Sequence, residues 1–519
     1  MFKISHLFFI TLLILFSACQ TGSYQKIPKA VMVDKVKGGW AGKMIGVQYG
    51  AVMEFKAVGK TYEDSIHWKP EMVEGALHQD DIYGQLNFMM TFEQYGLDVA
   101  ADSLARNFAD ARFPLCHANL QCRKNYFDAI PVAELATPEN NIHCEDIDFQ
   151  IEADFIGFVN PAMPQSSNAL CQKVGSLMAW GDGLYGGMFV AAMHTLAFTS
   201  NDVVYVVEEA LKAIPAQSTY AMCIRDVLDA YRQDAGNWRR AWQRVQEKWG
   251  QYNNCTPFHQ FNIDAKINGA YIAIGLLFGK GDFEKTMEIA VRCGQDTDCN
   301  AANAAAVLGI IYRYEGIPEQ FKSAIPAMAD KEFLFTHYSF NKAVDQSMAF
   351  VEQNVLANGG KVTDTEFIIR NQQPVAPATP QHSMNLRMKY YVQVLNADKW
   401  RFDENWSDFT YSDGDNDPYK VANGPGATLE IDFEGSGVAL LGSWNEDCGK
   451  AKVYIDGEFM KEIDTYYREE AGKYDVNRAY IFHKMNLPSG KHTLRLVVSD
   501  EKNPLSAGHK LYVERMIVY

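Results

Sequence analysis

The stretch KGGWAGKMIGVQYG, residues 37–50, carries a glycine at every fourth position in a segment whose other residues have a helical pattern. Each of Gly38, Gly42, Gly46 and Gly50 costs about 1 kcal/mol relative to alanine inside a helix. Four glycines on one stripe therefore need a reason. Either this face packs closely against another helix, or its backbone approaches a bound group. Glu54 follows one turn after the stripe ends.

Two other segments place a pair of carboxylates just before a helix. Asp80-Asp81 precedes the apolar run 82–95, and Asp296-Thr297-Asp298 precedes the alanine-rich run 300–314. An acid at a helix start is a routine cap, because it accepts hydrogen bonds from free backbone N–H groups. A cap uses only one acid of a pair, so a second interpretation stays open. If the two helix starts meet, four carboxylates converge, and their repulsion favours divalent cations such as Mg²⁺ or Ca²⁺.

The hydrophobic period changes along the chain, which predicts two folded domains joined by a linker. Residues 30–357 have a mainly helical pattern, and residues 358–384 include a proline-rich segment typical of extended linkers. From 385 to 519 apolar residues alternate, and Asp456-Gly457 is a strong hairpin signal. Short alternating strands at this spacing predict an antiparallel β-sandwich.

Residues 1–18 have the pattern of a bacterial signal peptide. Lys3 precedes the uncharged run 7–16, which is too short to span a bilayer. Small residues before Cys19 resemble a lipobox, which predicts lipidation of Cys19 and a tether over 19–29. The alternative is ordinary secretory cleavage near Ala18. The lipid-anchored interpretation places the protein in the cell envelope, periplasmic or on the cell surface, with the anchor as its only membrane contact.

The net charge argues against a nucleic-acid partner, and the cysteine pattern argues against a zinc ribbon. The chain has 519 residues, and 48 lysines and arginines against 64 acidic residues give a net charge of −16. A chain this acidic is not expected to bind the backbone of a nucleic acid. Besides Cys19, an odd number of cysteines remains with no CxxC pair, so a zinc ribbon is not supported. Most of these cysteines are expected to be buried.

Residues 35–321 resemble the ADP-ribosylglycohydrolase family, which removes ADP-ribose from modified proteins. The resemblance rests on the glycine stripe ending in Gly50-Ala51-Val52-Met53-Glu54-Phe55, on Gln79-Asp80-Asp81, on residues 210–218, on residues 294–300, and on Gly316-Ile317-Pro318. It implies an all-α bundle with two Mg²⁺ ions in a cleft, with Ca²⁺ or Mn²⁺ as alternatives. The expected fold is therefore multidomain, an ADP-ribosylglycohydrolase-like helical bundle followed by an antiparallel sandwich of the jelly-roll or galactose-binding-like type.

The resemblance also implies roles for individual residues. Glu54 and Asp81 would be catalytic. The metal ligands would come from the two acidic motifs: Gln79, Asp80, Asp81, Asp296, Asp298 and Cys299. Candidates for substrate binding are two acids before a Gly/Pro-broken stretch and two residues of the glycine-rich stretch 180–187: Glu152, Asp154, Asp182 and Tyr185.

Three departures from the family pattern bear on the substrate. Gln79 and Cys299 stand where the family has threonines, and the sulfur of Cys299 is a poor match for a hard ion such as Mg²⁺. The stretch 180–187 lacks the family's histidine. The protein is therefore expected to be a poor hydrolase of ADP-ribosyl-arginine or ADP-ribosyl-serine.

The resulting expectation is a metal-dependent hydrolase of a glycosidic bond, an ADP-ribosyl or related ribose or furanose C1 linkage. Two alternatives stay open: a secreted glycoside or nucleoside hydrolase acting on another sugar, and a non-catalytic sugar-binding protein. In each case the partner is a small-molecule or glycan-type sugar. Five aromatic residues of the sandwich either stack on a sugar or form its core: Trp400, Trp406, Trp444, Tyr466 and Tyr467.

Overall fold

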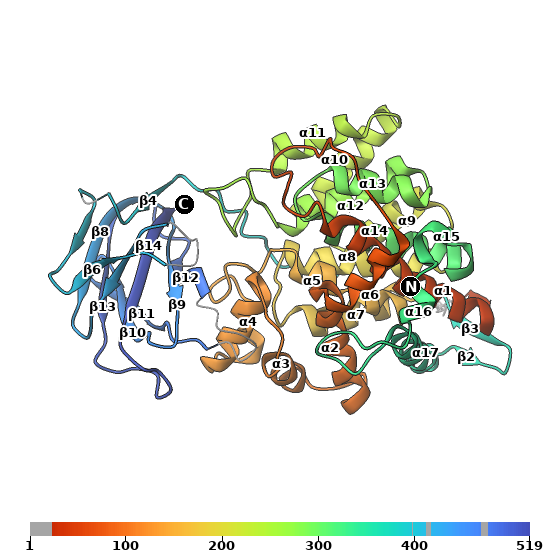
Figure 1. Cartoon of the computed structure of the whole chain (residues 1–519), viewed down its shortest axis with the longest axis horizontal. Coiled ribbons are helices and arrows are strands. Elements are labelled where there is room, and N and C mark those ends of the chain that lie inside the picture. The colour runs from red at the N-terminus through yellow and green to blue at the C-terminus, as the bar shows by residue number, and fades with distance from the viewer. Residues whose placement is uncertain (1–22, 397, 412–416, 469–475) are drawn as a thin grey trace, which may run out of the picture.

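The computed structural model describes residues 23–396, 398–411, 417–468 and 476–519. Within these residues a helical domain is followed by a domain of two antiparallel β-sheets, which confirms the predicted fold class (Figure 1). The predicted signal peptide and Cys19 lie outside the described residues, so the lipid anchor stays a prediction. In the described part of the chain, no helix combines the length and apolar character needed to cross a bilayer.

The helical domain has an interior of helices that are buried on every side. All residues of α8 and α12 are buried, and so is the first part of α14. A helix buried all round is apolar all round, apart from polar groups that find partners inside the domain. The elements are α1 (Lys29–Ala51), η1 (Pro70–His78), α2 (Asp80–Tyr95), α3 (Ala101–Ala109), α4 (His117–Phe127), η2 (Val132–Glu134), α5 (Asp148–Glu152), α6 (Asp154–Phe158), α7 (Pro164–Gly175), α8 (Asp182–Ala197), α9 (Val203–Ala210), η3 (Leu211–Ala213), α10 (Thr219–Gln233), α11 (Trp238–Trp249), α12 (Ala265–Gly279), α13 (Phe283–Arg292), α14 (Thr297–Gly316), α15 (Glu319–Lys322), α16 (Ile325–Met328) and α17 (Phe340–Ala357).

The glycine stripe packs α1 against α14 backbone to backbone. A Cβ atom added to Gly42 would lie 2.3 Å from the carbonyl oxygen of Ala305, and one added to Gly46 would lie 2.5 Å from that of Ala301. At the end of the stripe, a Cβ on Gly50 would lie 2.2 Å from the carbonyl oxygen of Thr297. The helices therefore run antiparallel, and no side chain fits between them. This close packing brings the end of α1 to the start of α14.

A small sheet ties the two ends of the helical domain together. Strand β1 (Tyr24–Pro28) pairs antiparallel with β3 (Glu366–Arg370), which also pairs with β2 (Lys361–Val362). The strands form because Phe367 and Ile369 alternate inward and are buried. The predicted tether therefore contributes β1 and the predicted linker contributes β2 and β3 to this domain. The extended connection is confined to the residues between β3 and β4.

The second domain is a sandwich of two antiparallel sheets, ordered β11-β10-β13-β8-β5 and β12-β9-β14-β7-β6, with β4 also paired to β14. Asp456-Gly457 joins β10 to β11 as a two-residue hairpin with both residues at positive φ, as predicted. The strands are β4 (Tyr390–Gln393), β5 (Trp400–Phe402), β6 (Trp406–Phe409), β7 (Tyr419–Ala422), β8 (Thr428–Gly435), β9 (Val438–Trp444), β10 (Lys450–Ile455), β11 (Glu458–Asp464), β12 (Val476–Lys484), β13 (Gly490–Val498) and β14 (Leu511–Val518).

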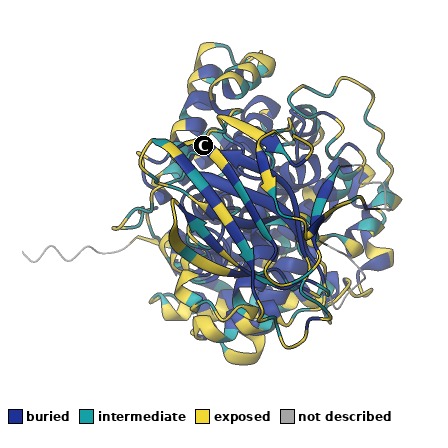
Figure 2. Ribbon diagram, turned by 90° about the vertical axis from the view of Figure 1, so that its left-hand side faces the viewer, coloured by how far each residue is buried: buried dark blue, intermediate teal, exposed yellow. Residues whose placement is uncertain are grey.

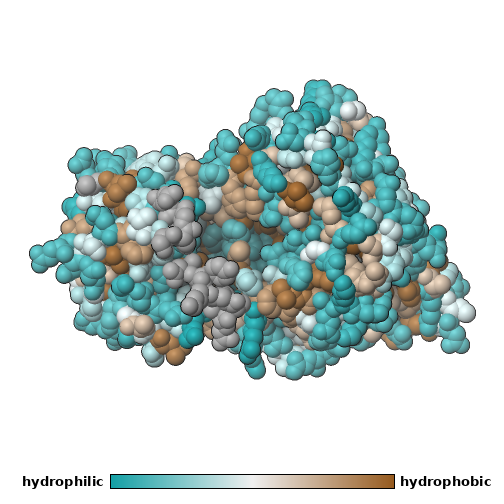
Figure 3. Space-filling view, viewed as in Figure 1, coloured by the Kyte–Doolittle hydropathy of each residue, from teal (hydrophilic) through white to brown (hydrophobic). Residues whose placement is uncertain are grey.

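The sandwich packs on the helical domain through one of its sheets. Strands β8 and β13 alternate between buried and more exposed residues, whereas every residue of β9 and β14 is buried (Figure 2). The second face of these two strands is covered because Ala439, Leu441 and Ile517 form an apolar cluster with Ile142 of the helical domain. The space-filling view shows a mostly hydrophilic face that is hollowed between the two domains (Figure 3).

The helix contact predicts the effect of a single methyl group. Gly42→Ala should lower the melting temperature, because overpacking reduces the free energy of unfolding by about 2 kcal/mol. In an open helix the same change ordinarily stabilises by about 1 kcal/mol. Thermal unfolding followed by circular dichroism measures this. Gly490→Ala is the control, because no atom lies within 4 Å of a Cβ there and its φ is not positive. A Gly42→Ala variant that melts at or above the wild-type temperature would contradict the close contact.

Candidate functional site

Carboxylates from four separate segments line one cavity of about 140 Å³ in the helical domain. They come from the loop after α1, from the starts of α2 and α14, and from α5: Glu54, Asp80, Asp81, Asp148, Glu152, Asp296 and Asp298. Phe55, Tyr83 and Phe113 supply apolar wall. No lysine or arginine lies among the described residues that line the cavity. The two acidic motifs and Glu54 therefore converge, as the sequence predicted.

The end of α1 sets the position of Glu54. Thr297 Oγ1 donates a hydrogen bond to the carbonyl oxygen of Gly50, at 2.9 Å. Beyond it, the N–H of Phe55 donates to Gln295 O at 3.1 Å, and the N–H of Gln295 donates to Ala57 O at 3.0 Å. Each loop thus satisfies the backbone of the other. Glu54 is held on the loop that faces the start of α14.

The acids at the helix starts do not act as ordinary N-caps. The residues that precede α2 and α14 are Gln79 and Asp296, and neither side chain accepts a hydrogen bond from the first turn of its helix. Gln79 is also absent from the cavity lining. Ligand atoms of Asp296, Asp298 and Cys299 lie within 4.8 Å of one another, a spacing at which they can hold a metal ion. Asp80 Oδ1 and Asp298 Oδ1 each accept a hydrogen bond from the N–H of the next residue, at 3.1 and 2.9 Å, so backbone bonding accounts for one oxygen of each of these two acids and not for the whole set.

Burial and mutual repulsion raise the pKa values of the cavity carboxyl groups. The pKa of Glu54 is raised to about 8 by burial and then by the charges of Asp298, Asp80 and Asp81. That of Asp298 is raised to about 7 by burial and by Asp81. The pKa of Glu152 is well above its usual range, because the group is buried and lies near Asp148. These carboxyl groups therefore hold their protons to a higher pH than free ones, because no lysine or arginine among the described lining residues stabilises their charged forms.

Four buried oxygen atoms on the cavity-lining residues have no hydrogen-bond partner. They are Asn119 Oδ1, Asp148 Oδ2, Glu152 Oε2 and Asp296 Oδ1. Because a buried acceptor without a donor is costly, these atoms indicate a ligand that supplies donors or positive charge. Sugar hydroxyls and divalent cations are two such ligands.

Asp81 is the member of the set that the protein itself neutralises. Lys43, which is fully buried, places Nζ 2.9 Å from Asp81 Oδ2, and Cys299 Sγ donates to Asp81 Oδ1 at 3.1 Å. Burial alone would lower the pKa of Lys43, but Asp154 and Asp81 together raise it above its usual value. Both oxygens of Asp81 are thus engaged within the protein.

The structure does not place Asp154 in the cavity, so its predicted substrate-binding role is wrong. Its carboxylate is fully buried, pairs with Lys43 at 3.0 Å, and accepts two hydrogen bonds from Asn303 Nδ2. His194 lies 3.3 Å away on the other side. Asp154 is the second counter-charge of a buried lysine and has no oxygen left for a sugar.

The predicted roles of Asp182 and Tyr185 are also wrong. Asp182 accepts hydrogen bonds from the Tyr220 N–H and Thr219 hydroxyl, and lies 3.6 Å from buried Lys266. Tyr185 bonds through its hydroxyl to the backbone of Gln381. The stretch 180–187 therefore starts α8 and anchors the linker between the domains, because its glycines allow close packing in the interior.

Three residues of the cavity were not foreseen: Asn119, Asp148 and His117. A signal for Asp148 was present, because Asp146-Ile147-Asp148 repeats the Asp-x-Asp pattern directly before a helix, α5. Burial and the neighbouring Asp146 raise the pKa of Asp148 to about 8. Glu152, which the sequence did predict, belongs to the same helix and accepts a hydrogen bond from Asn119 Nδ2 at 2.9 Å.

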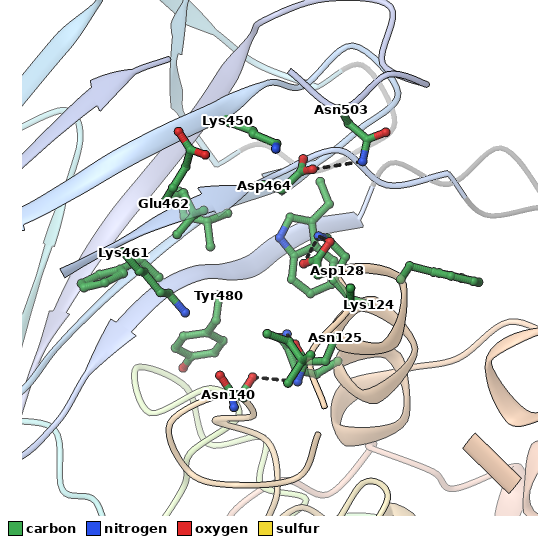
Figure 4. Close-up of a pocket in the computed structure, with 18 of the residues that line it drawn as sticks. Lys124, Asn125, Asp128, Asn140, Lys450, Lys461, Glu462, Asp464, Tyr480 and Asn503 are labelled. Atoms are coloured by element: carbon green, nitrogen blue, oxygen red, sulfur yellow. Dashed lines mark hydrogen bonds and ion pairs between the residues drawn. The ribbon is translucent and has the colours of Figure 1, made fainter. Parts of the chain in front are cut away.

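A second cavity, of about 500 Å³, lies between α4 and the sandwich (Figure 4). Lys124 and Asn125 of α4, with Asp128 just after its end, face Lys450 and Asp464 of the sandwich across it. Of the five aromatic residues considered for sugar stacking, Trp444 lines this cavity. Trp444 also belongs to the buried core of the sandwich, together with Trp400, Trp406 and Tyr467. A sugar-binding role for the sandwich stays a prediction that concerns Trp444 and Tyr466.

The fold and the site define a helical protein whose inner helices hold a carboxylate-lined cavity suited to cations and sugars. The sequence model of the ADP-ribosylglycohydrolase family, a family of glycosidase-type hydrolases, matches residues 28–343. This match covers more than half of the chain, and the chain belongs to that family.

Individual relatives are more distant. Over 78 residues the chain is 35% identical to A type blood alpha-D-galactosamine galactosaminidase from Flavonifractor plautii; this is 15% of this chain and 7% of that protein, so the chain spans only a small part of its relative. A solved ADP-ribosylglycohydrolase-related protein complex has a TM-score of 0.40 and 16% identity, covering 63% of this chain and 99% of that one. A two-domain esterase active on acetylated mannans has a TM-score of 0.21 and 12% identity, covering 41% of this chain and 58% of that one.

An aspartate paired with a buried lysine and an aspartate of the cavity should differ in their effect on stability. In EDTA, Asp154→Asn should destabilise the protein by about 3 kcal/mol, because it leaves buried Lys43 short of a counter-charge and sets an amide nitrogen against Asn303 Nδ2. Asp298→Asn should leave the melting temperature unchanged or raise it, because it relieves repulsion in the cavity. Differential scanning calorimetry of both variants makes the comparison. Equal decreases in melting temperature in the two variants would contradict the division between acids with and without a lysine counter-charge.

Proposed function

We propose that the protein is a metal-dependent glycosidase-type hydrolase that cleaves the bond at the anomeric carbon of a neutral sugar bound in the acidic cavity. Membership of the ADP-ribosylglycohydrolase family supports the reaction class. The observation that carries the proposal is the set of buried, unpartnered acceptor oxygens around this cavity. The alternative is a non-catalytic protein that binds a sugar in the same cavity. The turnover assay below distinguishes the two.

The donor set fits a hard divalent cation. Mg²⁺, Mn²⁺ and Ca²⁺ bind carboxylate oxygens, and Asp296 Oδ1 is buried without a partner while Asp80 and Asp298 line the same cavity. These three residues would hold the cations, and Asp81 would join them if the Cys299 thiol gave up its hydrogen bond. When bound, the cations would supply Lewis-acid polarisation and positive charge next to the sugar. Cys299 would then act as a donor that orients Asp81 and not as a ligand.

Glu54 is the candidate acid. It is half-buried at the start of the loop after α1, where burial, and then the neighbouring carboxylates in the metal-free protein, raise its pKa to about 8. A protonated carboxyl group next to a bound sugar can donate its proton to the leaving-group oxygen. Glu152 and Asn119 supply free acceptor oxygens for sugar hydroxyls, and Phe55 and Tyr83 offer apolar surface for the sugar ring.

The charge of the cavity favours a neutral sugar over a diphosphate. Recognition of a diphosphate ordinarily uses arginine, lysine or a helix N-terminus free of acids. Here the described cavity lining contains no lysine or arginine, and acids occupy the starts of α2 and α14. A furanoside, a nucleoside or a glycan-linked sugar therefore fits the site better than an ADP-ribosyl group.

Turnover tests the proposed reaction. The full chain, incubated with Mg²⁺, Mn²⁺ or Ca²⁺ and a panel of nitrophenyl furanosides and pyranosides and nucleosides, should release the aglycone only with metal. Glu54→Gln should reduce kcat by about 10²- to 10⁴-fold, because the amide cannot transfer a proton, while the metal-induced rise in melting temperature persists.

Asp296→Ala should lose both activity and the metal-induced rise. Glu352→Gln, an exposed change on α17, is the matched control and should behave as wild type. Metal-induced stabilisation and sugar binding without turnover on any substrate would leave the protein as a binding protein and refute the hydrolase.

Specificity is tested separately. Release of ADP-ribose from ADP-ribosyl-arginine or ADP-ribosyl-serine should be at least about 100-fold slower than turnover of the best neutral glycoside, a difference of about 2.7 kcal/mol in transition-state binding. The physical reason is the acidic lining together with Cys299, which lines the cavity in place of a threonine. Efficient metal-dependent release of ADP-ribose from a modified protein would overturn the preference for a neutral sugar.

A further inference from the structure

Two histidines, an aspartate and a cysteine meet beside the acidic cavity. His117 begins α4, His143 and Asp146 lie in the loop before α5, and Cys255 lies in the loop before α12. One ligand atom from each of the four residues falls within 4.8 Å of all the others. His117 also lines the acidic cavity, so the cluster lies in its wall.

The contacts within the cluster leave donors and acceptors only partly matched. His117 Nδ1 lies 3.1 Å from Cys255 Sγ, and His143 Nδ1 lies 2.7 Å from Asp146 Oδ2. The other carboxylate oxygen, Asp146 Oδ1, is buried and has no hydrogen-bond partner. A buried carboxylate with a free oxygen next to a thiol and two imidazoles indicates that a cation completes the cluster.

The donor types select the class of cation. Imidazole nitrogen and thiolate sulfur suit Zn²⁺ and similar borderline ions, whereas Mg²⁺ and Ca²⁺ prefer oxygen.

We propose that His117, His143, Asp146 and Cys255 form a second metal site, separate from the acidic cavity and specific for Zn²⁺ or a similar transition-metal ion. Four protein ligands are typical of a closed structural site; here Asp146 and Cys255 are buried and the two histidines are partly buried. Its chemistry differs from that of the acidic cavity, which offers carboxylate oxygens from Asp80, Asp296 and Asp298.

The position of this site gives it a structural purpose. Tyr480 of β12, labelled in Figure 4, donates its hydroxyl to the carbonyl oxygens of Asn254, at 2.8 Å, and Cys255, at 3.1 Å. Its ring packs edge-on against His143, with centroids 5.2 Å apart. A metal ion held here would fasten three loops of the helical domain at the surface where the sandwich docks.

Cobalt substitution of the full chain tests the site. The metal-stripped wild type titrated with Co²⁺ should gain the absorption of tetrahedral cobalt with a thiolate-to-cobalt charge-transfer band, at a stoichiometry of one ion per chain. Cys255→Ser should lose the charge-transfer band, and His143→Ala should weaken binding at least about 10-fold. Zn²⁺ should displace Co²⁺, and a large excess of Mg²⁺ should not.

The control distinguishes the two metal sites, because each contains one cysteine. Cys299→Ser, on the acidic side, should keep the charge-transfer band, and Asp296→Ala should keep it as well. Loss of the band in Cys299→Ser with its retention in Cys255→Ser would overturn the proposal, and so would the absence of any thiolate band in the folded wild type. If Cys255→Ser fails to fold, the zinc content of the wild type after extensive dialysis decides: one ion per chain supports the site, and none refutes it.

Discussion

The backbone contact between α1 and α14 is the constraint on which the rest of the site depends. Four glycines of α1 face carbonyl groups of α14 at distances that exclude any Cβ atom. The contact holds the end of one helix against the start of the other, so the loop carrying Glu54 pairs with the loop carrying Gln295. Only this arrangement places Glu54 beside Asp296 and Asp298. The cost of four glycines in a helix, about 1 kcal/mol each, is offset by packing that fixes the geometry of the cavity.

Two buried lysines divide the acidic residues of the domain into two groups. Lys43 engages Asp81 and Asp154, and Lys266 lies beside Asp264 and Asp182. These acids have counter-charges inside the protein and stabilise the fold. Asp81 belongs to both groups, because it pairs with Lys43 and also lines the cavity. A second set of acids lines the cavity, where the described lining residues include no lysine or arginine: Glu54, Asp80, Asp148, Glu152, Asp296 and Asp298. The raised pKa values of Glu54, Asp296 and Asp298 show that their ionised forms lack a counter-charge, which a bound cation would supply.

The structural features that could be predicted from the sequence are local in the chain. Those that could not be predicted depend on residues far apart in sequence. The glycine stripe, the acidic helix starts and the change of period near residue 358 are each legible within a few turns of chain, and each has its counterpart in the structure. Asp154 and Asp182 resemble the cavity acids in sequence, but their lysines lie far away along the chain, so their burial as ion pairs could not be inferred. Asp148 was legible, because Asp146-Ile147-Asp148 repeats the Asp-x-Asp pattern. The cluster of His117, His143, Asp146 and Cys255 has no spacing that marks it, because three distant segments supply it only after folding.

The most direct test of the central claim is crystallography of the full chain in Mn²⁺, whose anomalous scattering locates the ion without reference to the protein. The convergence of the two acidic helix starts predicts two peaks in the cavity, about 4 Å apart, with oxygens of Asp80, Asp296 and Asp298 in coordinating contact. It also predicts that the Glu54 carboxyl group faces the ions. Anomalous peaks only outside the cavity, or an empty cavity with the carboxylates turned into contacts with the protein, would contradict it.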